Sequence, residues 1–271
     1  MKKILFMTLA MLTLGSVMTV TAAPKDKKKK EIKWDWDGTR SGNATIDNYL
    51  VAIDNTYKKI QTYKETMDSY QMKGDTININ GKYYAVAYML NAEGEMVTRG
   101  QVNWQCASAV ADGMNIVLDI TNGQLLTVDA TLALPELGLK ALSFGKYVKG
   151  GAAVFTQGIK EIKAIRGTWV ANSKKWKALK NGAIQDPASL NYFDEAALKN
   201  LNKCCYIKEI QPEDADYTAI VESKKAKSEE ELKADADAFA QQIAKYNVAP
   251  EDASKSLDDI SDEELEKELN A

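Results

Sequence analysis

The strongest constraint on the fold is a regular spacing of apolar residues in two long segments. From Ile46 to Tyr70, and again from Ala141 to Ile165, apolar or semi-polar residues recur at alternating intervals of three and four residues. These intervals place every member on one side of an α-helix. The sequence therefore predicts two long amphipathic helices, with Gly74 as the stop signal of the first.

Two glycines, Gly151 and Gly158, lie within the second stripe, between Phe144 and Ile165. A glycine inside a helix costs about 1 kcal/mol relative to alanine. Two of them on one seam indicate a place where another backbone approaches closely. Small-residue seams also occur in lipid-embedded helices, but lysines interrupt this segment every few residues, which favours a helix–helix contact in a water-exposed bundle.

The remaining patterns predict shorter elements. Helical spacing is expected over 102–120, 125–134, 169–179 (after a break at Gly167), 186–204 and 228–246, the last opened by a Ser228/Glu231 capping box. Alternation over 76–99, with a turn at 91–94, predicts a β-hairpin or a small antiparallel sheet. A short extended stretch at 206–210 is expected to pair with 217–221.

The dipeptide Asn122–Gly123 allows two interpretations. Helical spacing begins well upstream, at Val102, which favours two helices interrupted at this dipeptide. Asn-Gly between apolar runs is also typical of a two-residue hairpin turn, so a second hairpin over 115–129 is the alternative.

These patterns predict a mainly α protein, a helical bundle with a small antiparallel β-hairpin. The chain has 271 residues, of which 45% are hydrophobic, which suits one domain with loose ends. We expect that domain at 45–249, preceded by a Lys-rich and then Trp/Asp-containing segment at 23–44. An acidic tail at 250–271 follows, with a short helix over 262–269.

Residues 1–22 have the features of a secretory signal peptide. Lys2 and Lys3 precede an apolar stretch over 4–14, and Val20-Thr21-Ala22 is a small-residue cleavage site. Threonines and a glycine make an uncleaved anchor the weaker alternative. No cysteine lies in this segment, which excludes a lipoprotein anchor. We expect export to the periplasm or beyond the cell, with no membrane span left afterwards.

A run of lysines directly follows the expected cleavage site, at Lys25, Lys27, Lys28, Lys29 and Lys30. Such a run is typically a solvated tether, or it makes weak contact with an anionic surface such as lipid headgroups.

The amino-acid composition excludes several kinds of catalytic and binding site. The chain has no histidine, which removes Ser/His and Cys/His catalysis and histidine-ligated zinc. Its 35 basic and 38 acidic residues give a formal charge of −3, which argues against nucleic-acid binding by bulk charge. No phosphate-loop or dinucleotide motif is present, so no cofactor is expected. A hydrolase using a carboxylate pair stays an alternative, with no pair singled out.

Three cysteines remain to be explained, Cys106, Cys204 and Cys205. Cys106 and Cys204 lie on predicted apolar stripes, so a disulfide between their helices is one alternative in an oxidising compartment. The favoured interpretation is buried, unreactive thiols. No metal site is expected.

The string Trp34-Asp35-Trp36-Asp37 holds the candidate ligand-binding residues. A calcium loop fails here, because its first and twelfth positions would be Lys33 and Ala44. The favoured interpretation is that the tryptophans anchor the N-terminal segment on the bundle. The alternative is stacking on sugars or other flat ligands.

The sequence therefore predicts an exported, non-catalytic binding or interaction protein whose partner or envelope ligand is unidentified. The alternatives are a helical bundle acting on anionic lipid surfaces and the hydrolase described above.

Overall fold

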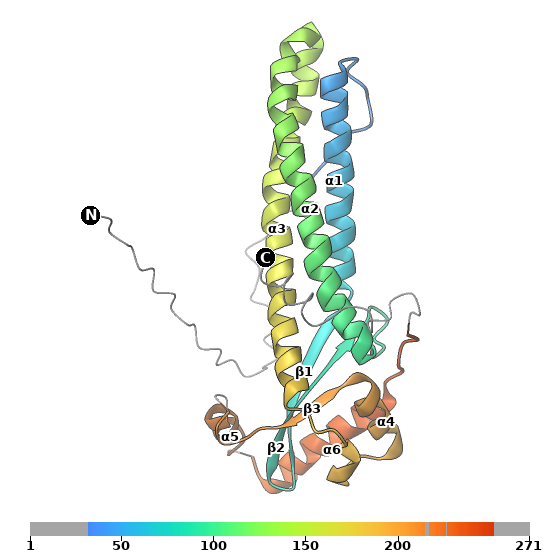
Figure 1. Cartoon of the computed structure of the whole chain (residues 1–271), viewed down its shortest axis with the longest axis vertical. Helices are drawn as coiled ribbons and strands as arrows, with labels where there is room; N and C mark the ends of the chain where they lie inside the picture. The colour runs from blue at the N-terminus through green and yellow to red at the C-terminus, as the bar shows by residue number, and fades with distance from the viewer. Residues whose placement is uncertain (1–31, 215–216, 226, 252–271) are drawn as a thin grey trace, which may run out of the picture.

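The computed structural model describes residues 32–214, 217–225 and 227–251 and has two parts (Figure 1). Three long helices lie side by side as a bundle: α1 (Ala44–Asp68), α2 (Arg99–Ala133) and α3 (Ala141–Asn181). A small sheet with three shorter helices lies at one end of it. The predicted mainly α bundle with a minor antiparallel β component is confirmed. The predicted signal peptide, the lysine run and the helix at 262–269 lie outside the described residues.

The stripe predicted over 46–70 is the buried face of α1. Ile46, Tyr49, Ile53, Ile60 and Met67 are all buried along it. The side chain of Asn43 caps the helix by accepting hydrogen bonds from the backbone N–H groups of residues 45 and 46. The predicted stop at Gly74 is wrong, since α1 ends at Asp68 and Gly74 lies within the first strand.

The glycine seam of α3 is buried in a close contact with α1, as predicted, but side chains rather than backbone lie directly against the two glycines. The space at Gly151 is filled by the Ile53 side chain and the Tyr49 hydroxyl of α1. A Cβ at Gly158 would lie 2.6 Å from Cδ1 of Ile60. Branched side chains of α1 therefore fit into notches that the missing Cβ atoms leave in α3, which allows close helix packing.

Asn122–Gly123 neither breaks a helix nor forms a hairpin, so both interpretations are wrong. Helix α2 runs through the dipeptide. Gly123 is buried against the ring of Phe155 on α3, and any side chain there would overlap that ring. Tertiary packing on the bare glycine backbone thus outweighs its low helix propensity.

The break expected at Gly167 is likewise absent, and residues 169–179 belong to α3 rather than to a separate helix. Ile162 and Trp169, on either side of Gly167, are buried in the bundle and hold the helix together there. At the other end of α3, the 3-10 helix η1 (Leu134–Lys140) forms the connection from α2.

The predicted hairpin is present, with a different turn. Strands β1 (Gln71–Ile79) and β2 (Lys82–Leu90) pair antiparallel and are joined by Asn80–Gly81. Both turn residues have positive φ, 52° and 82°, as a tight hairpin turn requires. The turn expected at 91–94 leads instead into a short loop, where Met96 makes only isolated bridges.

The sheet is completed by β3 (Tyr206–Glu209), which pairs antiparallel with β2 in the order β1-β2-β3. The predicted extended stretch at 206–210 is confirmed. Its expected partner at 217–221 is wrong, because those residues begin helix α5 (Tyr217–Lys225).

The helix predicted from residue 186 to Cys204 is divided in two. A 3-10 turn, η2 (Pro187–Leu190), ends at Asn191 in a left-handed conformation, and Asp194 caps helix α4 (Glu195–Cys204). Helix α6 (Glu229–Lys245) has the predicted Ser228/Glu231 capping box.

The bundle and the sheet end have separate buried clusters, and side chains of α2, α3 and β3 join them. The Trp176 indole donates a hydrogen bond to Asn103 (2.9 Å), and its ring packs against Tyr206 at 4.6 Å between centroids. The Arg99 guanidinium lies 4.5 Å above the same tyrosine ring and donates to the carbonyls of Leu201 and Cys205. These contacts fix the angle between the two parts.

Candidate functional site

Trp34 is held tightly on the bundle. Its indole N–H donates to Asp54 of α1 (3.3 Å), and its ring meets Tyr147 of α3 edge-on at 6.1 Å. The ring also packs over Gly150, where a Cβ would lie 3.6 Å from it. Trp34 therefore bridges α1 and α3 and anchors the N-terminal segment there, as the favoured interpretation predicts.

Trp36 is half-buried like Trp34 and also packs against the bundle cluster, and its indole N–H donates to the carbonyl of Thr39 (3.0 Å). Asp35 and Asp37 are exposed. The Thr39 backbone N–H donates to Asp37 (2.9 Å), which lowers the pKa of that carboxyl. Both tryptophans therefore pack on the bundle while the two carboxylates face outward, and ligand binding by these four residues stays a prediction.

The three cysteines are buried free thiols, so no disulfide joins Cys106 to Cys204. Cys106 belongs to the bundle cluster, whereas Cys204 and Cys205 belong to the sheet-end cluster. Burial raises the pKa of Cys106 to about 12 and that of Cys204 to about 11. A thiol must ionise to act as a nucleophile, so these environments suppress that chemistry.

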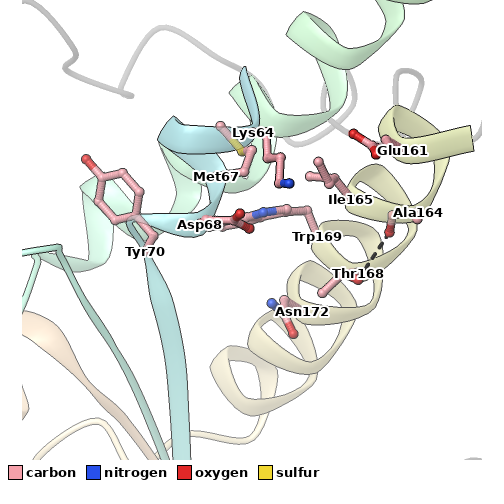
Figure 2. A pocket seen from close by; sticks show the side chains of 10 residues that line it. All are labelled: Lys64, Met67, Asp68, Tyr70, Glu161, Ala164, Ile165, Thr168, Trp169 and Asn172. Carbon is pink, nitrogen blue, oxygen red and sulfur yellow. Dashed lines mark hydrogen bonds between the residues drawn. The ribbon is translucent and has the colours of Figure 1, made fainter. Parts of the chain in front are cut away.

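A cleft of about 540 Å³ opens where the end of α1 diverges from the middle of α3 (Figure 2). The buried indole of Trp169 lies on one wall and Lys64 reaches toward it from α1, while Glu161 projects from α3. The remaining lining residues are Met67, Asp68, Tyr70, Ala164, Ile165, Thr168 and Asn172. The volume suits a small ligand.

The charges around this cleft do not single out a reaction. The Thr168 hydroxyl donates to the carbonyl of Ala164 in its own helix (3.1 Å). Burial raises the pKa of the Asp112 carboxyl, but Asp112 does not line the cleft. Among the described residues, no group of three or more acidic or cysteine side chains is placed to hold a metal ion.

A group of exposed apolar side chains at one end of the bundle was not expected from the sequence. Seven large hydrophobic side chains are 38–93% exposed: Leu118, Leu125, Leu126, Val128, Leu132, Leu139 and Leu142. We call them the distal apolar face, because they lie on the half of α2 farthest from the sheet, on η1 and on the first turn of α3 (Figure 1). Leu118, Leu125 and Leu132 are seven residues apart, a signal that could have revealed this face.

Comparison of the chain with protein-family models, with curated proteins and with solved structures finds no significant match. None of the helices that the structure describes combines the length and the apolar composition needed to cross a bilayer.

Proposed function

We propose that this chain is an exported, non-catalytic interaction protein whose binding surface is the distal apolar face, and that the partner contributes an apolar α-helix. Export rests on the sequence of residues 1–22 and is tested by N-terminal sequencing of the secreted chain, which is expected to begin at Ala23.

One observation supports the proposal most strongly. The large hydrophobic side chains that are exposed among the described residues all lie on the distal half of α2, on η1 or on the first turn of α3. Scattered exposed leucines are ordinary, but a contiguous group is characteristic of an interaction site. Burying a leucine side chain contributes about 1.5–3 kcal/mol, so several together can offset the roughly 4–15 kcal/mol cost of association.

The charges beside the α2 part of the face favour a protein partner over an anionic membrane. No lysine or arginine follows Arg99 in α2, and Asp129 is exposed there, whereas Asp119 is paired with Lys59 and Lys140 lies between Leu139 and Leu142. Carboxylates repel anionic lipid headgroups. The long axis of the face also follows α2, which suits a helix laid alongside it.

Site-specific photo-crosslinking in cells that export the chain tests the proposal. A benzophenone amino acid at Leu125 is expected to give a discrete adduct. The same probe at Ala153, an exposed position at a similar level of the bundle on α3, is the matched control. Leu132→Lys, one helical heptad away on the face, should abolish the Leu125 adduct because it places a charge in the apolar contact.

An adduct at Leu125 no stronger than that at Ala153 would contradict the proposal. Flotation with vesicles of phosphatidylglycerol and phosphatidylcholine covers the lipid alternative. Binding that Leu132→Lys abolishes would show that a bilayer, rather than a helix, covers the face.

A further inference from the structure

The cleft between α1 and α3 is lined by charged side chains that are not paired. Lys64 and Asp68 come from the last turns of α1, and Glu161 comes from the facing part of α3 (Figure 2). Among the described residues none of the three has a salt-bridge partner, whereas Lys59, earlier on α1, is paired with Asp119. The cleft therefore holds charges of both signs that a bound molecule can contact.

A buried hydrogen-bond donor in the same cleft also lacks a partner. Trp34, Trp36 and Trp176 each donate their indole N–H to an oxygen atom of the protein. Trp169 has no such acceptor among the described residues, although only 4% of its surface is exposed. Figure 2 shows its indole nitrogen turned toward the α1 wall of the cleft. A buried polar group without a hydrogen bond costs free energy, so this donor favours a ligand that supplies an acceptor.

We propose that this cleft binds a neutral carbohydrate, a mono- or disaccharide, whose hydroxyl groups contact the Trp169 N–H and the charged side chains. The cleft lies toward the sheet, whereas the distal apolar face lies at the other end of the bundle (Figure 1). The inference therefore adds a second site to the proposed function. The cleft volume of about 540 Å³ lies within the usual range for small-molecule sites.

The two signs of charge favour a neutral ligand. An anionic molecule could accept hydrogen bonds from Lys64 and Trp169. It would, however, be repelled by the carboxylates of Asp68 and Glu161. An organic cation could pair with these carboxylates, but an ammonium group has no acceptor for the Trp169 N–H and is repelled by Lys64. A hydroxyl group both donates and accepts, so the same hydroxyl can accept from the indole and donate to a carboxylate.

The other lining residues suit the two kinds of surface on a sugar ring. Met67, Ala164 and Ile165 offer apolar contact to its C–H groups. The Tyr70 hydroxyl and the Asn172 amide are half-buried, and each can both donate and accept. A peptide unit has a single donor and a single acceptor, whereas a sugar ring has several hydroxyls. A sugar can therefore satisfy more of these polar groups at once.

Fluorine NMR of the purified mature protein, labelled with 5-fluorotryptophan, locates the binding site. The chain has five tryptophans, and Trp169→Phe assigns the Trp169 resonance by removing it. The probes are glucose, galactose, mannose, N-acetylglucosamine, cellobiose, maltose and lactose. At least one of them, at millimolar concentration, is expected to shift the Trp169 resonance in a saturable way and to shift the other four tryptophan resonances less.

Isothermal titration calorimetry with the sugar that binds tests the contacts. Asp68→Asn alters an exposed side chain and should weaken binding roughly tenfold, because a charge-assisted hydrogen bond is lost. Glu65→Gln is the matched control, since it removes the same charge from an exposed position of α1 outside the cleft. It should leave the affinity unchanged.

A second pair of variants tests the indole donor. Trp169→Phe keeps an aromatic ring but removes the N–H, and it should weaken binding by a similar factor. Trp104→Phe, at a half-buried position of α2 outside the cleft, should not. Circular dichroism melting checks that each variant is folded, and the exposed Asp68 keeps the test valid if Trp169→Phe does not fold.

Several results would overturn the proposal. One is the absence of a Trp169 shift with every sugar tested. Another is a shift with tetramethylammonium or N-acetylalaninamide alone, because a cation or a peptide unit would then be the ligand. A sugar that shifts Trp34 or Trp36 instead would bind at the N-terminal string, and equal losses of affinity in Asp68→Asn and Glu65→Gln would exclude the cleft. Photo-crosslinking at Leu125 tests the distal apolar face independently of all these results.

Discussion

The distal half of the bundle and the sheet end of the molecule differ in how far their large apolar side chains are buried. At the sheet end, side chains such as Val86, Leu201 and Phe239 are enclosed among β-strands, α4 and α6. In the distal half, leucines along one side of α2 lie in water. The same fold therefore buries large apolar side chains where helices and strands pack on them. The exposed face is therefore a local feature that calls for a functional explanation.

The two parts are also held together by different contacts. The bundle relies on shape, with isoleucine and phenylalanine side chains fitted against Gly151, Gly158 and Gly123. The sheet end relies more on polar groups. The Asn200 amide donates hydrogen bonds to the carbonyls of Ile243 and Tyr246, and these two bonds connect α4 to the end of α6. We expect substitutions in the bundle to act through packing, and those at the sheet end through unsatisfied hydrogen bonds.

The largest expected effect is at the joint between the parts. Trp176→Ala should lower the free energy of unfolding by about 3–5 kcal/mol, as expected for removing a buried tryptophan. It also leaves Asn103 without its indole donor and Tyr206 without its ring contact. Urea denaturation followed by circular dichroism measures the change. Trp176→Phe retains a ring and should cost clearly less; equal losses would show that ring packing is unimportant here.

Glycine substitutions sharpen the distinction between notched and open positions of the bundle. Gly123→Ala should destabilise the protein by about 3 kcal/mol, because the new methyl group overlaps the Phe155 ring. Gly167→Ala is the matched control: it also lies inside a long helix, but with nothing within 4 Å of the added atom. It should stabilise by up to about 1 kcal/mol through helix propensity. Thermal melting should show a lower melting temperature for Gly123→Ala and a higher one for Gly167→Ala. Shifts of the same sign would contradict this prediction.

Three Asn-Gly dipeptides show how far local sequence determines the fold. Asn80–Gly81 forms the hairpin turn, Asn122–Gly123 lies inside α2, and Asn181–Gly182 ends α3. The dipeptide has the same intrinsic turn preference each time, and its surroundings decide the outcome. Apolar periodicity predicted α1 and most of α3 because it depends on one face of one helix. The continuity of α2 could not be predicted, because it depends on a phenylalanine from another helix.

The candidate sites were less predictable than the fold. The anchoring of Trp34 could be predicted because a tryptophan next to an amphipathic helix tends to pack on it. Its partners Asp54 and Tyr147 could not, because they come from two different helices. The cleft beside Trp169 arises from the divergence of α1 and α3, which no local pattern encodes. The seven-residue spacing of Leu118, Leu125 and Leu132 was present in the sequence, but the break expected at Asn122–Gly123 divided it.

Alkaline pH offers a test of burial inside the bundle. The Tyr63 hydroxyl donates to the carbonyl of Ala109, and burial raises its pKa to about 12 from an ordinary value of 10.0. The unfolded chain therefore loses this proton first, and the stabilisation present below pH 10 is lost as the pH rises toward 12. Between pH 8 and pH 11 we expect a loss of about 1.4 kcal/mol from this residue. Urea denaturation between pH 8 and 11 should show that the free energy of unfolding declines less steeply for Tyr63→Phe than for the wild type. Equal declines would show that Tyr63 does not contribute to the loss of stability.

The smallest expected effect on folding is at the tip of the distal apolar face. Leu139 and Leu142 are 93% and 87% exposed, so replacing both by serine should change the free energy of unfolding by no more than about 0.5 kcal/mol. If these residues serve binding, the same double variant should lower the yield of the Leu125 photo-adduct. Trp176→Ala would then affect mainly the stability of the fold, and the leucine variant mainly the contact with the partner. A loss above about 2 kcal/mol would instead mean that the tip leucines are enclosed in the folded chain, and the division between a closed and an open end would not hold.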